Sequence, residues 1–265
     1  MSRIVITLTT VPERLNNDSE NGIKLVLKSL CEQSHKDYEV HFNLPEIYKV
    51  TGEKYVIPNW LRDYQNLYNH LKIFNVEDYG PPTKIIPTIL RVDKETLIIV
   101  VDDDLIYHKD MVVEHEKYHQ KFNNSVILYD GRSLVNPKFG DLRDSWVLSV
   151  AEPLEVKELQ HYKSASYFAK YFDKDFFDLF VGKTKSDDIL VSYYFKYKKI
   201  KLMVVPYEPD VDKLKNYNDW YKFQGVETFP VIKHAHSISD TGCNHPTMLK
   251  TEPKFYLPED FKRIN

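Results

Sequence analysis

The stretch from Leu97 to Asp104 reads Leu-Ile-Ile-Val-Val-Asp-Asp-Asp, an apolar β-branched run that stops at three carboxylates. Five apolar residues are too few to span a membrane and are typical of a central parallel strand that is covered on both faces. Carboxylates at the carboxyl end of such a strand lie in the crevice where open α/β sheets bind ligands. Three adjacent carboxylates repel one another, and oxygen ligands suit Mg²⁺ or Mn²⁺. The junction therefore favours a metal site over a solvated acidic turn.

Composition narrows the class of protein. The chain has 265 residues, of which 42% are hydrophobic and 28% charged, and its net charge is -3, so there is no electrostatic case for nucleic-acid binding. Cys31 and Cys243 form no CxxC pair, which favours a reducing compartment. We find no signal peptide or transmembrane segment and expect a cytoplasmic protein. The chain has 8 glycines and no glycine-rich phosphate loop. A metal and side chains would therefore have to hold the phosphates of a bound nucleotide.

Strands and helices are expected to alternate in the first hundred residues, which predicts a βαβ unit and a parallel sheet. The expected elements there are strands at 4–8, 38–44 and 72–74, and helices around 23–30, 60–71 and 83–86. In the second half we expect helices at 111–122, 164–172 and 187–198, and strands at 126–129 and 201–205. We predict a single α/β domain over 1–265, with a nucleotide-binding half at 1–104 and a second half at 105–265.

Four motifs follow one another along the chain. They are Leu8-Thr9-Thr10-Val11-Pro12-x-Arg14, Asp78-Tyr79-Gly80-Pro81-Pro82-Thr83-Lys84, Val101-Asp102-Asp103-Asp104 with Ile106-Tyr107 behind it, and Asp187-Asp188-Ile189. In this order, over about residues 3 to 205, the chain resembles GT-A-fold glycosyltransferases, most closely a group of bacterial and large-virus enzymes. The resemblance implies a Rossmann-like, mostly parallel central sheet flanked by helices, with a smaller acceptor-side portion. It also implies Mn²⁺- or Mg²⁺-dependent transfer of a hexose or deoxyhexose from a UDP- or GDP-linked donor to a hydroxyl of a glycan or other acceptor.

The resemblance identifies Asp102 and Asp104 as a DxD pair. Residues two apart in an extended backbone point to the same side, so one carboxylate can hold the ribose or a metal-bound water while the other ligates the metal. The residues that the resemblance places at the donor are Thr9, Thr10, Pro12, Arg14, Lys84, Asp102 and Asp103. For Arg14 a surface position is the alternative, and for Lys84 it is a solvated cation at the start of a helix.

An inverting transfer needs a base for the acceptor hydroxyl, and by resemblance Asp188 fills this role with Asp187 as its neighbour. Both are expected at a helix N-terminus, where the macrodipole favours ionised carboxylates, so one of them acting only as a helix cap is the alternative. His234 and His236 flank Ala235, which puts both imidazoles on one side of an extended segment. Related enzymes often bring a C-terminal histidine to the metal, and either residue is a candidate ligand.

Three other functions compete with this reading. His115, Glu116 and His119 match the HExxH pattern of zinc metallopeptidases, without the xxGxxH extension. A sugar-nucleotide pyrophosphorylase would share the fold and the metal chemistry, but its signature is a glycine-rich N-terminal loop with a basic residue, and loop 9–14 has no glycine. A non-catalytic carbohydrate-binding protein is the third alternative, because the stretch 146–153 lacks the glycines that relatives often have there.

Overall fold

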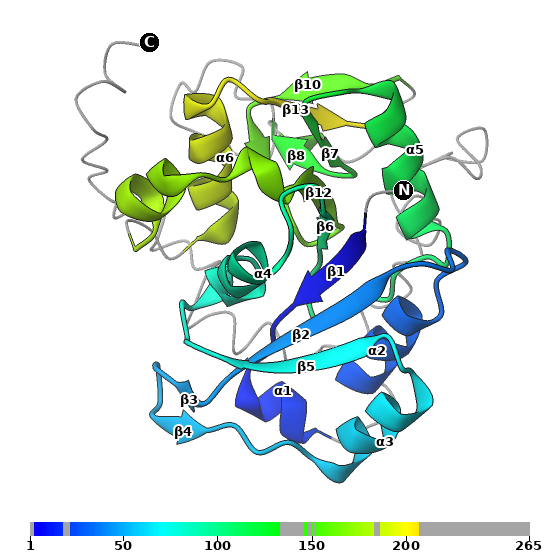
Figure 1. Cartoon of the computed structure of the whole chain (residues 1–265), viewed down its shortest axis with the longest axis vertical. Coiled ribbons are helices and arrows are strands. Elements are labelled where there is room, and N and C mark those ends of the chain that lie inside the picture. Colours follow the sequence, from blue (N-terminus) through cyan, green and yellow to red (C-terminus); the bar gives the residue numbers. More distant parts are fainter. Residues whose placement is uncertain are drawn as a thin grey trace.

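A mixed sheet forms the centre of the molecule (Figure 1). The computed structural model describes residues 3–17, 22–132, 146–147, 150, 152–182 and 186–206. In these ranges the eight strands of the sheet lie in the order β10-β13-β7-β12-β6-β1-β2-β5. Their bounds are Ile4–Leu8 (β1), Glu39–Pro45 (β2), Leu71–Val76 (β5), Leu97–Val100 (β6), Ser125–Leu128 (β7), Leu154–Val156 (β10), Ala165–Phe168 (β12) and Lys201–Val204 (β13). Only β12 and β10 run antiparallel to their neighbours, which confirms the predicted, mostly parallel α/β sheet.

Helices cover both faces of this sheet (Figure 1). They are α1 (Pro12–Asn16), α2 (Ile23–Cys31), α3 (Asn59–Leu67), α4 (Ile86–Arg91), α5 (Met111–Lys121) and α6 (Asp187–Tyr197), with a 3-10 turn η1 (Pro81–Lys84) before α4. Smaller elements are the β3–β4 hairpin (Ile47–Tyr48, Glu53–Lys54), a small sheet of β8, β9 and β11 (Gly131–Arg132, Trp146–Val147, Glu158–Leu159), and the turns η3 (Ala169–Tyr171) and η4 (Phe176–Phe180).

Side chains that alternate along the central strands divide the core into two clusters. On β6, Leu97 and Ile99 pack with residues of α2, α3 and α5, whereas Ile98 and Val100 pack with residues of α4 and α6. Full burial of each such side chain stabilises the fold by about 1.5–3 kcal/mol relative to exposure. Burial on both faces is the physical reason for the continuous apolar run in the sequence.

The segment 164–172 was predicted as a helix, and this prediction is wrong. The structure has strand β12, followed by the short turn η3. Strand β12 pairs antiparallel with β6 on one side and with β7 on the other. Backbone hydrogen bonds on both edges and burial of Ala165 and Tyr167 therefore outweigh the weak helical pattern of the local sequence.

The order of the strands locates the ligand crevice. From β1 the chain continues through β2 to β5 on one side and then returns to β6 on the other side of β1. Such a reversal is a topological switch point, and ligands of open α/β sheets bind outside the carboxyl ends of the strands at this point. Because β12 is antiparallel, the residues before it arrive at the same edge. The carboxyl ends of β1 and β6 and the start of β12 therefore enclose one region.

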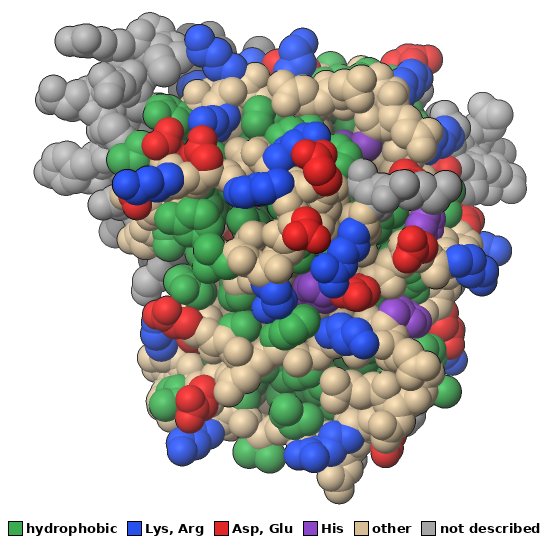
Figure 2. Space-filling model, in the orientation of Figure 1, with side chains coloured by type: hydrophobic (Ala, Val, Ile, Leu, Met, Phe, Trp, Pro, Cys, Tyr) green, Lys and Arg blue, Asp and Glu red, His purple; other side chains and the backbone are tan. Residues whose placement is uncertain are grey.

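The surface carries charges of both signs. On the face drawn in Figure 2, basic and acidic side chains are interspersed with apolar ones. None of the helices in the described ranges combines the length and the apolar composition needed to cross a bilayer.

Candidate active site

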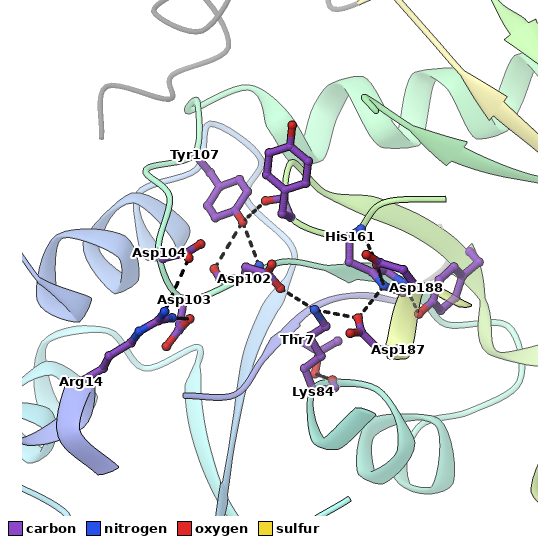
Figure 3. Close-up of polar contacts among 12 residues, drawn as sticks. Thr7, Arg14, Lys84, Asp102, Asp103, Asp104, Tyr107, His161, Asp187 and Asp188 are labelled. Carbon is purple, nitrogen blue, oxygen red and sulfur yellow. Dashed lines mark hydrogen bonds and ion pairs between the residues drawn. The ribbon is translucent and has the colours of Figure 1, made fainter. Parts of the chain in front are cut away.

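The acidic end of β6 meets the loop that follows β1 (Figure 3). The Asp103 carboxylate accepts hydrogen bonds from the Thr10 hydroxyl and from the Arg14 guanidinium. A second guanidinium nitrogen of Arg14 lies 3.7 Å from the Asp104 carboxylate. The structure thus brings together three residues that the sequence analysis assigned to the donor, Thr10, Arg14 and Asp103. It shows them bound to one another, so that Arg14 is an ion-pair partner of the acidic strand end.

The carboxylates after β6 suit a divalent cation. About a third of the side chain of Asp102 and of Asp104 is exposed, whereas that of Asp103 is nearly buried. Enclosure by the protein and the charges of Asp102 and Asp103 raise the pKa of Asp104 to about 7. Arg14 and Lys84 compensate the three carboxylates only in part. Two accessible carboxylates are a sufficient protein contribution for Mg²⁺ or Mn²⁺, which keep water and substrate phosphates as further ligands. The residues present therefore fit the predicted metal.

Lys84 connects the two groups of carboxylates. Its ammonium forms an ion pair with Asp102 and lies 2.7 Å from the Asp187 carboxylate. Burial acts against the charge, but Asp102 and Asp187 outweigh this effect and hold the pKa of Lys84 well above its ordinary value. Lys84 is thus a buried cation between the strand end and α6, which rules out the solvated helix-start position considered for it.

A buried polar network holds the backbone at Lys84. The Thr7 hydroxyl donates to the Lys84 carbonyl at 2.5 Å and lies 2.8 Å from the Thr88 hydroxyl. The Asn43 amide donates to the hydroxyls of Thr7 and Thr88 at 3.1 and 3.0 Å. These contacts join β1, β2 and α4. Hydrogen bonds from the central strands therefore fix the position of the Lys84 backbone.

Asp187 and Asp188 begin α6, as the sequence predicts. The helix cap is Ser186, whose hydroxyl accepts a hydrogen bond from the Ile189 backbone at 3.3 Å. Since Ser186 caps the helix, neither aspartate is needed for that purpose. Asp187 is nearly buried, whereas the Asp188 side chain is 25% exposed. Of the two, Asp188 is thus the carboxylate with access from the crevice.

The structure also brings His161 to this site, a residue that the sequence analysis missed. Its Nδ1 lies 2.7 Å from Asp187 and 2.8 Å from Asp188 (Figure 3). In the described ranges these three residues form the one group of three or more His, Cys, Asp and Glu side chains whose ligand atoms converge closely enough to hold a metal by themselves. Because the Lys84 ammonium already lies against Asp187, ion pairs account for the group. The sequence signal for this residue is the polar run 160–164, which precedes an aromatic stretch. It was missed because a helix was predicted at 164–172 in place of a turn followed by a strand.

Other predicted site residues have different positions. The Thr9 hydroxyl donates to the Asn43 carbonyl at 2.8 Å, which ties the end of β1 to β2. Pro12 is buried in the first turn of α1. These contacts give both residues a structural part in shaping the loop. The candidate metal ligands His234 and His236 lie outside the described residues.

The HExxH histidines are buried and contact serine hydroxyls at the start of β12. His115 places Nε2 2.7 Å from the Ser164 hydroxyl and Nδ1 2.7 Å from the Ser166 hydroxyl. The Nε2 of His119 lies 2.8 Å from the same Ser166. Glu116 points elsewhere, 3.5 Å from His35. The motif therefore fixes α5 against β12, and this geometry does not support the metallopeptidase alternative.

Solved structures share the fold at low sequence identity. TarS of S. aureus has a TM-score of 0.50 and 18% identity over 78% of this chain, which spans only 35% of the TarS chain. The 4-diphosphocytidyl-2C-methyl-D-erythritol synthase of Anaerococcus prevotii has a TM-score of 0.52 and 13% identity, covering 83% of this chain and 94% of the synthase. The mannosyltransferase PcManGT of Pyrobaculum calidifontis, solved with GDP-Man and Mn²⁺, has a TM-score of 0.49 and 14% identity over 77% of this chain and 54% of that one.

No family model and no curated protein matches the sequence. At these identities the structural likeness establishes the fold and leaves the reaction to be argued from the site. The mostly parallel sheet flanked by helices and the position of the acidic strand end agree with the expectation drawn from the four motifs. The chain thus has the GT-A fold, a mostly parallel α/β fold that it shares with TarS.

Proposed function

We propose that the protein is a glycosyltransferase that moves a sugar from a nucleoside-diphosphate donor to a hydroxyl of a glycan or other acceptor. The observation that carries the proposal is the meeting of two pairs of carboxylates on one buried ammonium. Asp102 and Asp187 both form ion pairs with Lys84, so the strand-end pair and the helix-start pair belong to one site. The first pair suits a metal and a diphosphate, and the second suits a proton acceptor.

Asp102 and Asp104 would hold Mn²⁺ or Mg²⁺, and the ion would supply positive charge to the diphosphate when the sugar leaves. Lys84 adds a second positive charge at the boundary between the two pairs. The hydrogen bonds that Thr10 and Arg14 donate to Asp103 hold the strand end in place beside the loop that follows β1. These roles of the carboxylates and of the neighbouring cations support a donor site at the carboxyl ends of β1 and β6.

Asp188 is the proposed base. Its carboxylate takes the proton of the acceptor hydroxyl while the acceptor oxygen bonds to the anomeric carbon and the bond from that carbon to the diphosphate breaks. The products are the glycoside and a nucleoside diphosphate. A single displacement with a base on the side opposite the leaving group inverts the anomeric centre, and we propose inversion for this reason. UDP- and GDP-linked hexoses or deoxyhexoses are the proposed donors.

The synthase among the structural neighbours makes nucleotide synthesis the second candidate, because its name describes a diphosphocytidyl product. Loop 9–14 argues against this reaction. Its one basic residue, Arg14, is paired with Asp103 and Asp104, and the loop has no glycine that would let backbone N–H groups surround a triphosphate. Sugar transfer from a diphosphate donor is therefore the better-supported function.

Thermal melting in the presence of nucleotides tests the donor site. We expect UDP or GDP to raise the melting temperature only with Mn²⁺ or Mg²⁺, by about 5–10 °C at a concentration near one hundred times the dissociation constant. Asp104→Asn should abolish this shift, because it removes a proposed metal ligand. The panel should contain UDP, GDP, CDP and TDP, each with Mn²⁺ and with EDTA.

Asp93→Asn is the matched control, since Asp93 lies in the turn before β6, at the opposite end of that strand from Asp104. It should retain the shift of the unmodified protein. Tight metal-dependent binding by Asp104→Asn would show that the DxD assignment is wrong. Stabilisation by CTP alone, with release of pyrophosphate, would favour nucleotide synthesis.

A further inference from the structure

His161 lies at a tight turn just before β12. The Ser164 backbone N–H donates to the His161 carbonyl at 2.9 Å, and Ser164 has a φ of +103°, a strained value for a residue other than glycine. Such strain persists only where the surrounding structure enforces it. The turn places the fully buried His161 side chain against the first turn of α6 (Figure 3).

Both the side chain and the backbone of His161 contact the proposed base. The His161 N–H donates to Asp188 Oδ1 at 2.9 Å, and Nδ1 lies 2.8 Å from the same oxygen. Nδ1 also lies 2.7 Å from Asp187 Oδ2, and Nε2 is 3.4 Å from the Tyr167 hydroxyl. An Nδ1 between two carboxylate oxygens has to carry a proton, because a lone pair would be repelled from both sides. The hydrogen bond from the His161 backbone and the ion pair with Nδ1 together hold Oδ1 of Asp188 in place, and we assign Oδ2 to the acceptor.

We propose that His161 is a positioning residue that orients the Asp188 carboxylate and, as an imidazolium, keeps it ionised for catalysis. The inference rests on the proposed function, in which Asp188 is the base. Opposite charges alternate through the site in the order Asp102, Lys84, Asp187, His161, Asp188. His161 is the cation at the acceptor end of this series, as Lys84 is at the donor end.

The groups that face His161 explain why a cation is needed there. They are Asp187 and Asp188 from α6 and Tyr167 from β12, while Lys84 from η1 reaches Asp187. Burial and the charge of Asp187 raise the pKa of Asp188, and His161 acts against this rise. Burial alone would lower the pKa of His161, but its contacts with Asp187 and Asp188 outweigh burial and raise it. Each group thus stabilises the charged form of the other.

Two substitutions separate the position of the nitrogen from its charge. In His161→Asn the amide nitrogen is as many bonds from Cα as Nδ1, so an N–H donor remains between the carboxylates without a positive charge. In His161→Gln the amide extends one bond further and the donor at the Nδ1 position is lost. The measurement is release of nucleoside diphosphate from a UDP- or GDP-sugar, as kcat and KM across pH 5 to 9, with Mn²⁺ present.

For His161→Asn we expect the rate at high pH to be largely retained, while the acid limb of the kcat profile moves up by about 1–2 pH units because Asp188 loses a neighbouring cation. For His161→Gln we expect kcat to fall at every pH, by on the order of a hundredfold, with KM for the donor unchanged. His119→Asn, at a buried histidine that contacts Ser166, is the control and should leave the acid limb in place.

An unchanged acid limb in His161→Asn would overturn the proposal, even if His161→Gln fails to fold. Equal kcat at all pH values for His161→Gln and the unmodified protein would also overturn it. The proposed function fails in a different way, if the unmodified protein releases no nucleoside diphosphate from any donor or if Asp188→Asn releases it as fast.

Discussion

At the scale of single residues, Asp187 and Asp188 are neighbours in the chain with different chemistry. Lys84 and His161 both lie 2.7 Å from Asp187, and although burial opposes its ionisation these cations lower its pKa. Burial and the Asp187 charge raise the pKa of Asp188. Environments that separate the pKa values of two carboxylates commonly assign them different roles in a reaction. Asp187 has the properties of a fixed anion, and Asp188 those of a proton acceptor.

Asp188→Asn should therefore separate binding from chemistry. We expect metal-dependent nucleotide binding to stay nearly unchanged, because Asp188 forms no ion pair with Lys84, and we expect only a moderate loss of stability, because His161 keeps Asp187 as an anion. Transfer should fall by about 10²–10⁴, the contribution of a general base. Calorimetry of nucleotide binding and a sugar-transfer assay measure the two effects. Loss of nucleotide binding would place Asp188 in the donor site, and normal transfer would show that the base lies elsewhere.

Asp187→Asn is the contrasting substitution in the same experiment. It leaves the buried Lys84 and His161 short of an anion, and breaking a buried ion pair costs about 3–5 kcal/mol. We expect a larger loss of stability here than in Asp188→Asn, because Asp187 pairs with two buried cations and Asp188 with one. Asp178→Asn, at an exposed acidic residue of η4, is the control for removing a carboxylate. Equal melting temperatures for Asp187→Asn and this control would contradict the role of Asp187 as a fixed anion.

At the scale of elements, the HExxH pattern in α5 contributes to the packing of this helix against β12. The imidazoles of His115 and His119 face the hydroxyls of Ser164 and Ser166 on a buried interface. Helical spacing puts the two histidines on one face, and this requirement is shared by zinc binding and by packing against a strand. The tertiary partner decides between the two.

We therefore expect no stoichiometric zinc bound through the HExxH histidines. Elemental analysis of the purified protein should give well under one equivalent of zinc, and His119→Ala should not change this value. Glu116→Gln should leave sugar transfer intact, because Glu116 contacts His35 on the outer side of α5. One equivalent of zinc that disappears in His119→Ala, together with peptide cleavage, would overturn the glycosyltransferase proposal.

At the scale of the whole molecule, buried histidines couple stability to pH. Burial lowers the pKa of His41 and of His119 to about 4 and also lowers that of His115 well below its ordinary value. The unfolded chain has ordinary histidines with a pKa near 6.5 and so binds more protons than the folded chain between about pH 4 and 6.5. Stability from these residues is present above pH 6.5 and is lost as the pH falls. His161 has a raised pKa and works in the opposite direction.

We expect the free energy of unfolding to fall on acidification from pH 6.5 toward 4, by up to about 1.4 kcal/mol per pH unit for each such histidine. Guanidinium unfolding at pH 7, 6 and 5 measures this slope. His119→Gln should reduce the slope by the share of one histidine, because glutamine has no proton to gain. A free energy of unfolding that stays constant or rises from pH 7 to pH 5 would contradict the burial of these histidines in their neutral form.

Sequence patterns predicted much of the fold because strands and helices with buried faces have periodic apolar residues. The strands and helices expected between residues 4 and 122 all appear, with ends displaced by a few residues, whereas α1 and the β3–β4 hairpin were not expected. The exception is β12, in which pairing with two neighbouring strands replaced an expected helix. Prediction of the site was less complete. Thr10, Arg14, Lys84 and the aspartates do gather, but their partners were not foreseen.

The sequence by itself determined the apolar strand that ends in Asp102, Asp103 and Asp104, and the pair of aspartates at the start of α6, because both depend on residues that are adjacent in the chain. Only the tertiary structure decided that Lys84 lies between the two groups and that His161 lies against the second. These contacts arise because β12 is inserted antiparallel between β6 and β7, which brings distant segments to one edge of the sheet. Strand order depends on the packing of the whole chain, and no local pattern encodes it.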